Sequence, residues 1–182
     1  MKRKLPNQEM LRCSSLHAGV MLSVLVALIA VSGCESQRSA PPPGSSVVRV
    51  SSADLLDEVR ARDTEITVVN LWATWCAPCV EEFPDIVRSV SAYDSTRVSL
   101  MFVSVDFDEQ IPEMLTFLRQ QKWHGPAYFK QEKDNAFVNG LDSLWTGAVP
   151  ATFVFARSGA LKWFHEGKLA ADSLSAAIDE AL

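Results

Sequence analysis

The most constraining feature of this chain is a pair of cysteines, Cys76 and Cys79, at a point where a strand should give way to a helix. Residues 66–72 are mostly apolar and rich in β-branched side chains, which is typical of a strand covered on both faces. Residues 77–93 then carry apolar side chains at helical spacing, namely Val80, Phe83, Ile86, Val87 and Val90. Two cysteines separated by two residues at such a junction predict thiol–disulfide exchange.

The position of Cys76 predicts a reactive thiol. Free backbone N–H groups and the helix dipole at the start of a helix favour an anion. The pKa of the Cys76 thiol should therefore lie below the value of about 8.5 of a free cysteine, and the thiolate is the form that attacks a disulfide. Cys79 lies one helical turn inward, close enough to attack the resulting mixed disulfide. Pro78 suits the first turn because its missing N–H has no partner to lose.

Two other interpretations of the cysteine pair remain open. The pair could be half of a structural zinc site, but such a site needs four ligands. Beyond the first 46 residues the chain adds only His124 and His165, which are far apart and lack ligand-like spacing, so we expect no metal and no cofactor. The pair could also be a permanent structural disulfide.

The start of the chain carries a targeting pattern. Residues 1–12 are basic, and residues 18–33 form a continuous uncharged and mostly apolar run, as in a secretory signal. The run ends in Val-Ser-Gly-Cys34, which resembles the lipobox of bacterial lipoproteins. That resemblance implies a signal peptide over residues 1–33 and lipidation at Cys34. The alternative is an uncleaved anchor, because residues 13–34 could cross a bilayer core of about 30 Å.

Either arrangement places the rest of the chain outside the cytoplasm, on a membrane and facing the periplasm or the cell exterior. Residues 34–46 include three consecutive prolines and no apolar periodicity, so we expect an extended tether there. Residues 47–182 form the predicted domain. Without residues 1–33 the chain has 13 basic and 21 acidic side chains, and this acidic balance argues against nucleic-acid binding.

The domain alternates predicted strands and helices. Helices are expected over residues 52–60, 77–93, 112–121 and 174–182, and strands over 66–72, 98–105, 127–129, 151–155 and 161–165. Residues 135–145 are expected to be irregular or helical. Strand-helix-strand units imply parallel pairing, and the final hairpin adds antiparallel strands. The predicted fold class is α/β, with a central mixed β-sheet flanked by helices on both faces.

Several stretches together resemble a known family. They are Trp-Ala-Thr-Trp-Cys-Ala-Pro-Cys at residues 72–79, Glu-Phe-Pro at 82–84, and Val-Pro-Ala-Thr-Phe at 149–153. They resemble the thioredoxin superfamily, and more narrowly the TlpA/ResA-type extracytoplasmic, membrane-anchored disulfide reductases. The resemblance covers residues 47–182 and implies a thioredoxin-like fold, with Cys76 as nucleophile and Cys79 as resolving thiol.

The resemblance also implies a substrate-binding surface. Pro150 matches the family's cis-proline, which would leave the backbone of Val149 free to pair with an extended substrate segment. Trp75 would shape this surface next to Cys76. Trp145 would either line the same face or pack in the core. Pro84 matches a proline that bends the active-site helix.

Glu82 is the remaining catalytic candidate. The resemblance places a glutamate at this position near the active site, where it would tune the thiols or accept a proton. The alternative is a solvated helix glutamate, as expected for Glu81. Cytosolic thioredoxins have a buried aspartate where this chain has Asn70, and the difference leaves Glu82 as the substitute proton acceptor.

Three functions are compatible with these residues. The first, which we favour, is a monomeric reductase of protein disulfides that takes electrons from a membrane donor, as members of the family it resembles do in cytochrome c maturation. The second is an oxidant that introduces disulfides. The reduction potential distinguishes the two, because a strong oxidant has a value near about -120 mV and a thioredoxin-like reductant one near about -270 mV. The third is a non-catalytic lipoprotein that holds a partner or copper.

Overall fold

The computed structural model describes residues 47–170 and 172–182. The predictions for the signal peptide, for the lipidation site Cys34 and for the tether lie outside the described residues. Within the described part of the chain, no helix has the length and apolar character needed to span a membrane.

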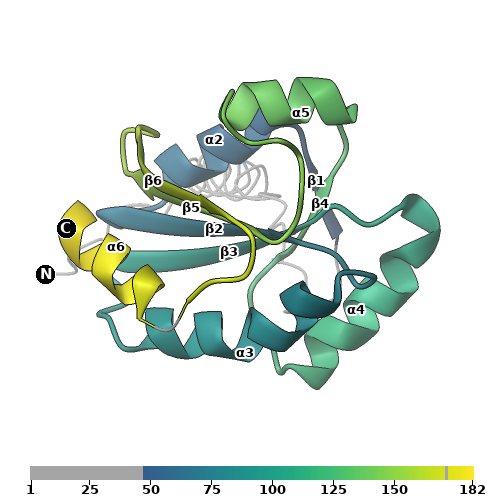
Figure 1. The fold of residues 1–182 in the computed structure, drawn as a ribbon, viewed down its shortest axis with the longest axis horizontal. Helices are drawn as coiled ribbons and strands as arrows, with labels where there is room; N and C mark the ends of the chain where they lie inside the picture. Colours follow the sequence, from purple (N-terminus) through teal and green to yellow (C-terminus); the bar gives the residue numbers. More distant parts are fainter. Residues whose placement is uncertain (1–46, 171) are drawn as a thin grey trace, which may run out of the picture. The chain divides into compact units, whose positions relative to one another are not determined.

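A six-stranded mixed sheet forms the centre of the domain (Figure 1). Its strands lie in the order β1 (Val47–Val50), β4 (Ala127–Lys130), β3 (Val98–Ser104), β2 (Ile66–Trp72), β5 (Ala151–Ala156) and β6 (Leu161–Glu166). β2 pairs in parallel with β3 on one side and antiparallel with β5 on the other. The end of β2 therefore lies between the end of β3 and the start of β5.

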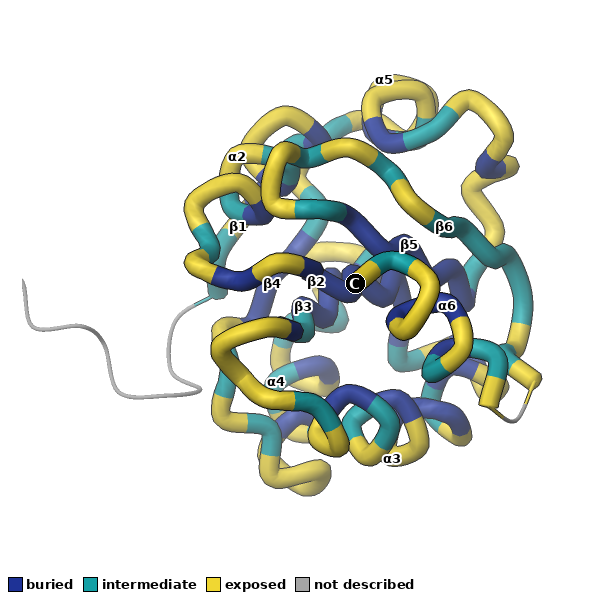
Figure 2. Tube along the Cα trace, turned by 90° about the vertical axis from the view of Figure 1, so that its left-hand side faces the viewer, coloured by how far each residue is buried: buried dark blue, intermediate teal, exposed yellow. Residues whose placement is uncertain are grey.

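Helices cover both faces of this sheet, as the sequence predicts (Figure 1). One face carries α2 (Ser52–Ala61) and α5 (Asp134–Leu141). The other face carries α3 (Ala77–Ser91), α4 (Ile111–Gln120) and α6 (Ser173–Ala181), and the short 3-10 turn η1 (Asp108–Gln110) precedes α4. Each face has its own apolar core, and Figure 2 shows the central strands buried beneath helices whose outer sides are exposed.

Alternation along β2 decides which side chains meet the active-site helix. All seven residues of β2 are buried. Val68 and Trp72 pack in the core beneath α3, whereas Val69 and Leu71 pack in the core beneath α2. Since neighbouring residues of a strand point to opposite faces, Asn70 shares the α3 face with Val68 and Trp72. A buried polar side chain is thus placed under the helix that begins at Ala77.

The structure adds one strand that the sequence analysis did not expect. β1 has only four residues, and it is an edge strand in which Val50 alone is fully buried. A segment this short has too few positions to display a period. The expected short strand at residues 127–129 is confirmed as β4, and the uncertain stretch after it contains α5 followed by irregular chain up to β5.

Candidate active site

Cys76 caps the helix that carries Cys79. The chain leaves β2 at Trp72, turns, and enters α3 directly after Cys76, which is the N-cap residue. The sulfur of Cys76 accepts a hydrogen bond from the backbone N–H of Cys79 at 3.3 Å. Pro78 lies in the first turn, where the sequence predicts it. The sulfur therefore stands in the N-terminal field of α3, which stabilises negative charge on it.

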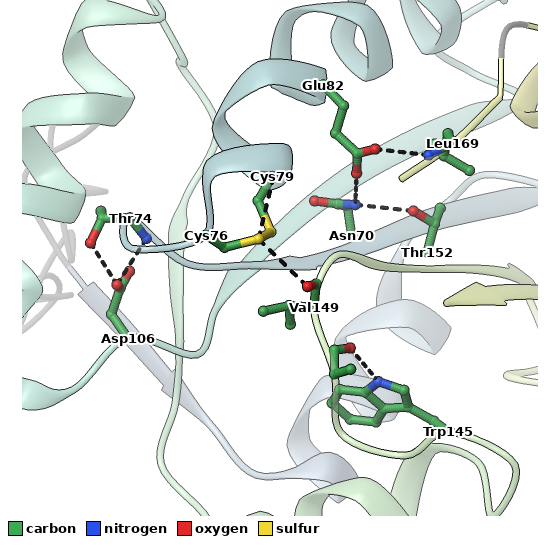
Figure 3. Close-up of a disulfide and its surroundings, with 11 residues drawn as sticks. Asn70, Thr74, Cys76, Cys79, Glu82, Asp106, Trp145, Val149, Thr152 and Leu169 are labelled. Atoms are coloured by element: carbon green, nitrogen blue, oxygen red, sulfur yellow. Dashed lines mark hydrogen bonds between the residues drawn. A yellow bond between two sulfur atoms is a disulfide. The ribbon is translucent and has the colours of Figure 1, made fainter. Parts of the chain in front are cut away.

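The two cysteines form a disulfide (Figure 3). The S–S distance is 2.05 Å and the Cα atoms are 5.2 Å apart. Cys76 is 5% exposed and Cys79 only 1%, so Cys76 is the more exposed residue of the pair. Trp75, immediately before it, is 53% exposed. Among the described residues, no group of three or more His, Cys, Asp or Glu side chains could hold a metal ion.

The segment before β5 brings Val149 and Pro150 to the disulfide. β5 starts beside the end of β2, since Ala151 pairs with Leu71. The peptide bond between Val149 and Pro150 is cis, and the carbonyl oxygen of Val149 lies 3.5 Å from the sulfur of Cys76. The residues that the sequence assigns to substrate binding are thus adjacent to the predicted nucleophile.

Trp145 packs inside the domain and does not line the active-site surface. It is buried, with its ring edge-to-face against Phe137 and Phe153. Its indole N–H donates a hydrogen bond of 2.8 Å to the carbonyl of Ala148 (Figure 3). Trp145 therefore supports the Val149 segment from beneath, and the suggestion that it lines the substrate face is wrong.

Asp106 is a buried residue of this site that the sequence analysis did not single out. One of its carboxylate oxygens accepts hydrogen bonds from the backbone N–H of Thr74 at 2.9 Å and from its hydroxyl at 2.7 Å. The other oxygen accepts from the hydroxyl of Ser104 at 2.7 Å. A signal for it exists in the sequence. Asp106 follows β3, and the carboxyl ends of parallel neighbours such as β2 and β3 meet at one edge of a sheet.

Glu82 is buried, and its interpretation as a solvated helix glutamate is wrong. It is 3% exposed and lies one helical turn beyond Cys79. One carboxylate oxygen accepts from the backbone N–H of Leu169 at 2.9 Å, and the other lies 3.5 Å from the side-chain nitrogen of Asn70. Asn70 also donates to the hydroxyl of Thr152 at 3.0 Å (Figure 3). By contrast, Glu81 is exposed and pairs with Lys168.

The protonation state of Glu82 follows from this burial. Loss of solvent raises the pKa of the Glu82 carboxyl above its ordinary value of 4.5, while the hydrogen bonds from Leu169 and Asn70 partly oppose the rise. A carboxyl shifted in this direction is better able to hold a proton near neutral pH.

A second exposed aromatic side chain lies beside the contact between Asp106 and Thr74. Phe107 is 68% exposed and directly follows Asp106, which is hydrogen-bonded to the loop that carries Trp75. An open pocket of about 300 Å³ lies between Thr74 of this loop and α4, with Phe117 in its lining. The sequence analysis did not identify Phe107, because its exposure cannot be inferred from the residue type alone.

The comparisons with known proteins agree with this geometry. A model of the AhpC/TSA family matches residues 48–164. The thiol:disulfide interchange protein HelX of Rhodobacter capsulatus is 30% identical over 122 residues, which cover 66% of this chain and 63% of HelX. The thiol-disulfide oxidoreductase ResA of Oceanobacillus iheyensis is 26% identical over 113 residues, which cover 62% of this chain and 55% of ResA. The matched part thus spans less than two thirds of either relative.

A solved structure has the same fold. The crystal structure of a thioredoxin-related protein from Neisseria meningitidis serogroup B superimposes with a TM-score of 0.56 at 26% identity, and the match covers 67% of this chain and 88% of that one. The predicted resemblance to the thioredoxin superfamily and to proteins of the ResA type is confirmed. The chain belongs to the AhpC/TSA family and has a thioredoxin-like fold.

Proposed function

We propose that this protein is a thiol–disulfide oxidoreductase that reduces disulfides in proteins outside the cytoplasm. The observation that carries the proposal is the position of the Cys76–Cys79 disulfide. It lies at the N-terminus of α3, with the sulfur of Cys76 3.5 Å from the carbonyl of Val149. The similarity to HelX and ResA, whose names describe this exchange, supports the same activity.

Reduction of a substrate begins at Cys76 in the dithiol form. Its thiolate attacks one sulfur of the substrate disulfide, a mixed disulfide forms, and the other substrate sulfur leaves as a thiolate that takes up a proton. The N-terminus of α3 and the N–H of Cys79 stabilise the attacking thiolate. Cys76 is assigned this step because it is the more exposed residue of the pair and caps α3.

Cys79 completes the exchange. Its thiol loses a proton, and the thiolate attacks the sulfur of Cys76. The second substrate sulfur leaves, so the substrate gains two electrons and two protons while the protein acquires the disulfide. Glu82 is assigned as the proton acceptor for Cys79. It is buried one turn along α3 with a raised pKa, and the other buried carboxylate of the described residues, Asp106, already accepts three hydrogen bonds.

The substrate segment is proposed to lie across Val149, next to Trp75 and Phe107. The backbone before Pro150 can pair with an extended chain, as in other cases of β-strand addition. The two exposed aromatic rings, one next to Thr74 and one next to Asp106, which Thr74 contacts, offer apolar contact. Because backbone pairing is independent of side chains, such a surface would accept protein substrates of varied sequence.

The reduction potential of the Cys76–Cys79 pair tests the direction of the reaction. Equilibration of residues 34–182 in glutathione or dithiothreitol buffers should give a value at or below about -250 mV, as for a reductant. A value near about -120 mV would instead identify an oxidant that introduces disulfides. If the pair does not cycle, or if Cys76→Ser retains full biological function, the protein is a binding module.

The proposed location is the cell envelope, with a lipid anchor at Cys34 and a membrane protein as electron donor. The basic start of the chain and the uncharged run before Cys34 support this placement. Cys34→Ser should leave the protein in the unprocessed, non-lipidated form, which mass spectrometry distinguishes from the native form. A role in cytochrome c maturation would appear as loss of haem attachment in a deletion strain, with restoration by the native chain and not by Cys76→Ser.

A further inference from the structure

Residues 146–150, which we call the Val149 segment, lie between α5 and β5 and form neither helix nor strand. A segment without regular structure loses conformational freedom when an extended substrate pairs with it, and that loss weakens binding. Substrate pairing at Val149 therefore gains from any contact that orders the segment before the substrate arrives.

Two consecutive residues at the end of β6 hold both ends of the Val149 segment. The carboxylate of Glu166 accepts hydrogen bonds from the backbone N–H and from the hydroxyl of Thr146, each 2.8 Å long. The backbone N–H of Gly167 donates to the carbonyl of Pro150 at 2.8 Å. The edge strand β6 thus fixes where this segment begins and where it ends.

Between these two ends, the backbone has a bonded side and an open side. The carbonyl of Ala148 accepts the indole N–H of the buried Trp145 (Figure 3). The carbonyl of Val149 instead lies 3.5 Å from the sulfur of Cys76, and its N–H donates to no other backbone group of the described residues. The contacts at positions 146, 148 and 150 therefore hold the segment and leave the backbone of Val149 open to an extended chain.

The contact between Glu166 and Thr146 has a counterpart on the other side of the disulfide. There the carboxylate of Asp106 accepts both the backbone N–H and the hydroxyl of Thr74. Hydrogen bonds to a carboxylate are stronger than those between neutral groups. Each of the two segments that meet at Cys76 is thus fixed by a carboxylate and a threonine.

We propose that Glu166 is a positioning residue that orders the Val149 segment for the binding of protein substrates. Its carboxylate fixes Thr146, and Thr146 in turn fixes the direction from which the chain approaches Val149. A substrate then pairs with backbone that is already ordered. Glu166 acts through this segment and takes no part in the exchange of disulfides. The inference rests on the proposed thiol–disulfide exchange and adds the residue that prepares its substrate-binding surface.

Glu166→Ala tests the proposal, because it removes both hydrogen bonds to Thr146. Glu65→Ala is the matched control, since Glu65 also accepts two hydrogen bonds, from Arg97 at 2.7 and 3.3 Å. Glu65 directly precedes β2, whereas the cysteines follow that strand. The control therefore removes an equivalent contact at the opposite end of the sheet.

Steady-state reduction of insulin by the full chain, with dithiothreitol as the electron source, measures the effect on substrate binding. Glu166→Ala should raise the KM for insulin about tenfold, because the substrate must then order the Val149 segment itself. The kcat should change by less than about twofold, since the contact does not act on the thiols. Glu65→Ala should change neither value.

Substitutions of Thr146 separate the loss of this contact from the loss of a charge at position 166. Thr146→Ser keeps both donors and should retain the native KM, whereas Thr146→Val loses the hydroxyl and should raise the KM roughly threefold. Adding Thr146→Val to Glu166→Ala should give no increase beyond that of Glu166→Ala alone. The threonine variants also keep the test available if Glu166→Ala folds poorly.

Two further measurements distinguish order in the Val149 segment from damage to the thiols. In the reaction of the reduced protein with 5,5′-dithiobis(2-nitrobenzoate), attack by Cys76 releases the first thionitrobenzoate, which stopped-flow absorbance follows. This probe has no backbone to pair with Val149, so the first release should slow far less than the KM for insulin rises. Backbone order parameters of Gly147 and Val149 from NMR relaxation should fall in Glu166→Ala and not in Glu65→Ala.

Three results would overturn the positioning role of Glu166. They are an equal KM for insulin in Glu166→Ala and Glu65→Ala, unchanged order parameters in Glu166→Ala, and a first release that slows as much as the KM rises. Failure of the native protein to reduce insulin would instead overturn the proposed exchange, and the order parameters would still show whether Glu166 orders the segment.

Discussion

Asp106 holds Thr74 through two hydrogen bonds to one carboxylate oxygen, from the backbone N–H at 2.9 Å and from the hydroxyl at 2.7 Å. The contact joins the residue after β3 to the loop that leads to Cys76. It therefore fixes the direction from which the chain enters α3. Hydrogen bonds to a carboxylate are stronger than those between neutral groups, so this contact restrains the loop.

Asp106→Ala should destabilise the domain and slow attack by Cys76. Loss of the acceptor leaves donors of Thr74 and Ser104 without a partner in the interior, at about 1–3 kcal/mol for each group. Thermal unfolding and the first release of thionitrobenzoate would measure the two effects. Asp108→Ala is the control, because that aspartate is exposed and pairs with Arg49 at the surface, a contact worth at most about 1 kcal/mol. Equal effects of the two substitutions would contradict the role of Asp106.

Glu82→Gln should stabilise the protein at neutral pH and not in acid. The folded protein keeps a proton on Glu82 at pH values where the unfolded chain, with a pKa near 4.5, has lost it. The free energy of unfolding of the native protein therefore falls as the pH rises from 4.5 to the raised pKa. Glutamine has no such charge to bury, so the variant's melting temperature should exceed the native one at pH 7 and match it near pH 4.

Glu81→Gln is the control for that measurement. Glu81 is exposed and pairs with Lys168 at the surface, so its substitution should change stability by at most about 1 kcal/mol. The difference in melting temperature between Glu82→Gln and the native protein could instead be lower at pH 7 than at pH 4. That result would show that the hydrogen bonds from Leu169 and Asn70 outweigh the cost of burying the charge.

Asn70→Asp should destabilise the domain above pH 5. The side-chain nitrogen of Asn70 lies 3.5 Å from an oxygen of Glu82, so the new carboxyl group would lie beside that of Glu82. Two carboxyl groups this close cannot both ionise readily. The substitution also removes the N–H group that Asn70 donates to Thr152. Adding Glu82→Gln removes the repulsion and restores a donor, so the double variant should recover most of the lost stability. Urea unfolding at pH 5 and pH 8 checks both expectations.

Trp75→Ala and Phe107→Ala should impair the reduction of proteins more than that of small disulfides. Both rings are largely exposed, and a polypeptide substrate would cover more of their surface than a small disulfide would. We expect a higher KM for a disulfide-bonded protein such as insulin, with little change in the rate of the first release of thionitrobenzoate. Leu182→Ala removes another exposed apolar side chain at the end of the chain, after α6, and should change neither value.

The parts of the fold that the sequence predicts well are those with a strong local period. β2, β3 and β5 are continuous apolar runs, and α3 has its apolar residues on one face. The burial of Glu82 follows from the same period, since position 82 lies three residues after Cys79 and four before Ile86, which are both buried. The sequence analysis left this open because a charged residue on the apolar face is unusual.

Contacts between distant segments were not available from the sequence. The hydrogen bonds of Asp106 to Thr74 and of Leu169 to Glu82 join residues 32 and 87 positions apart. Their formation depends on strand order and on the path of the segment after β6, neither of which has a local pattern. The burial of Trp145 likewise depends on α5 and β5 closing around it.

Cys76 and Val149 are neighbours in space but are separated by 73 positions along the chain. At a synthesis rate of about 5–20 residues per second, Val149 follows Cys76 off the ribosome by roughly 4–15 s. For that interval the growing chain presents a thiol before the segment that will cover it exists. The Cys76 thiol is therefore most able to form a disulfide with a wrong partner before synthesis reaches Val149. The order of the strands along the chain sets how long that period lasts.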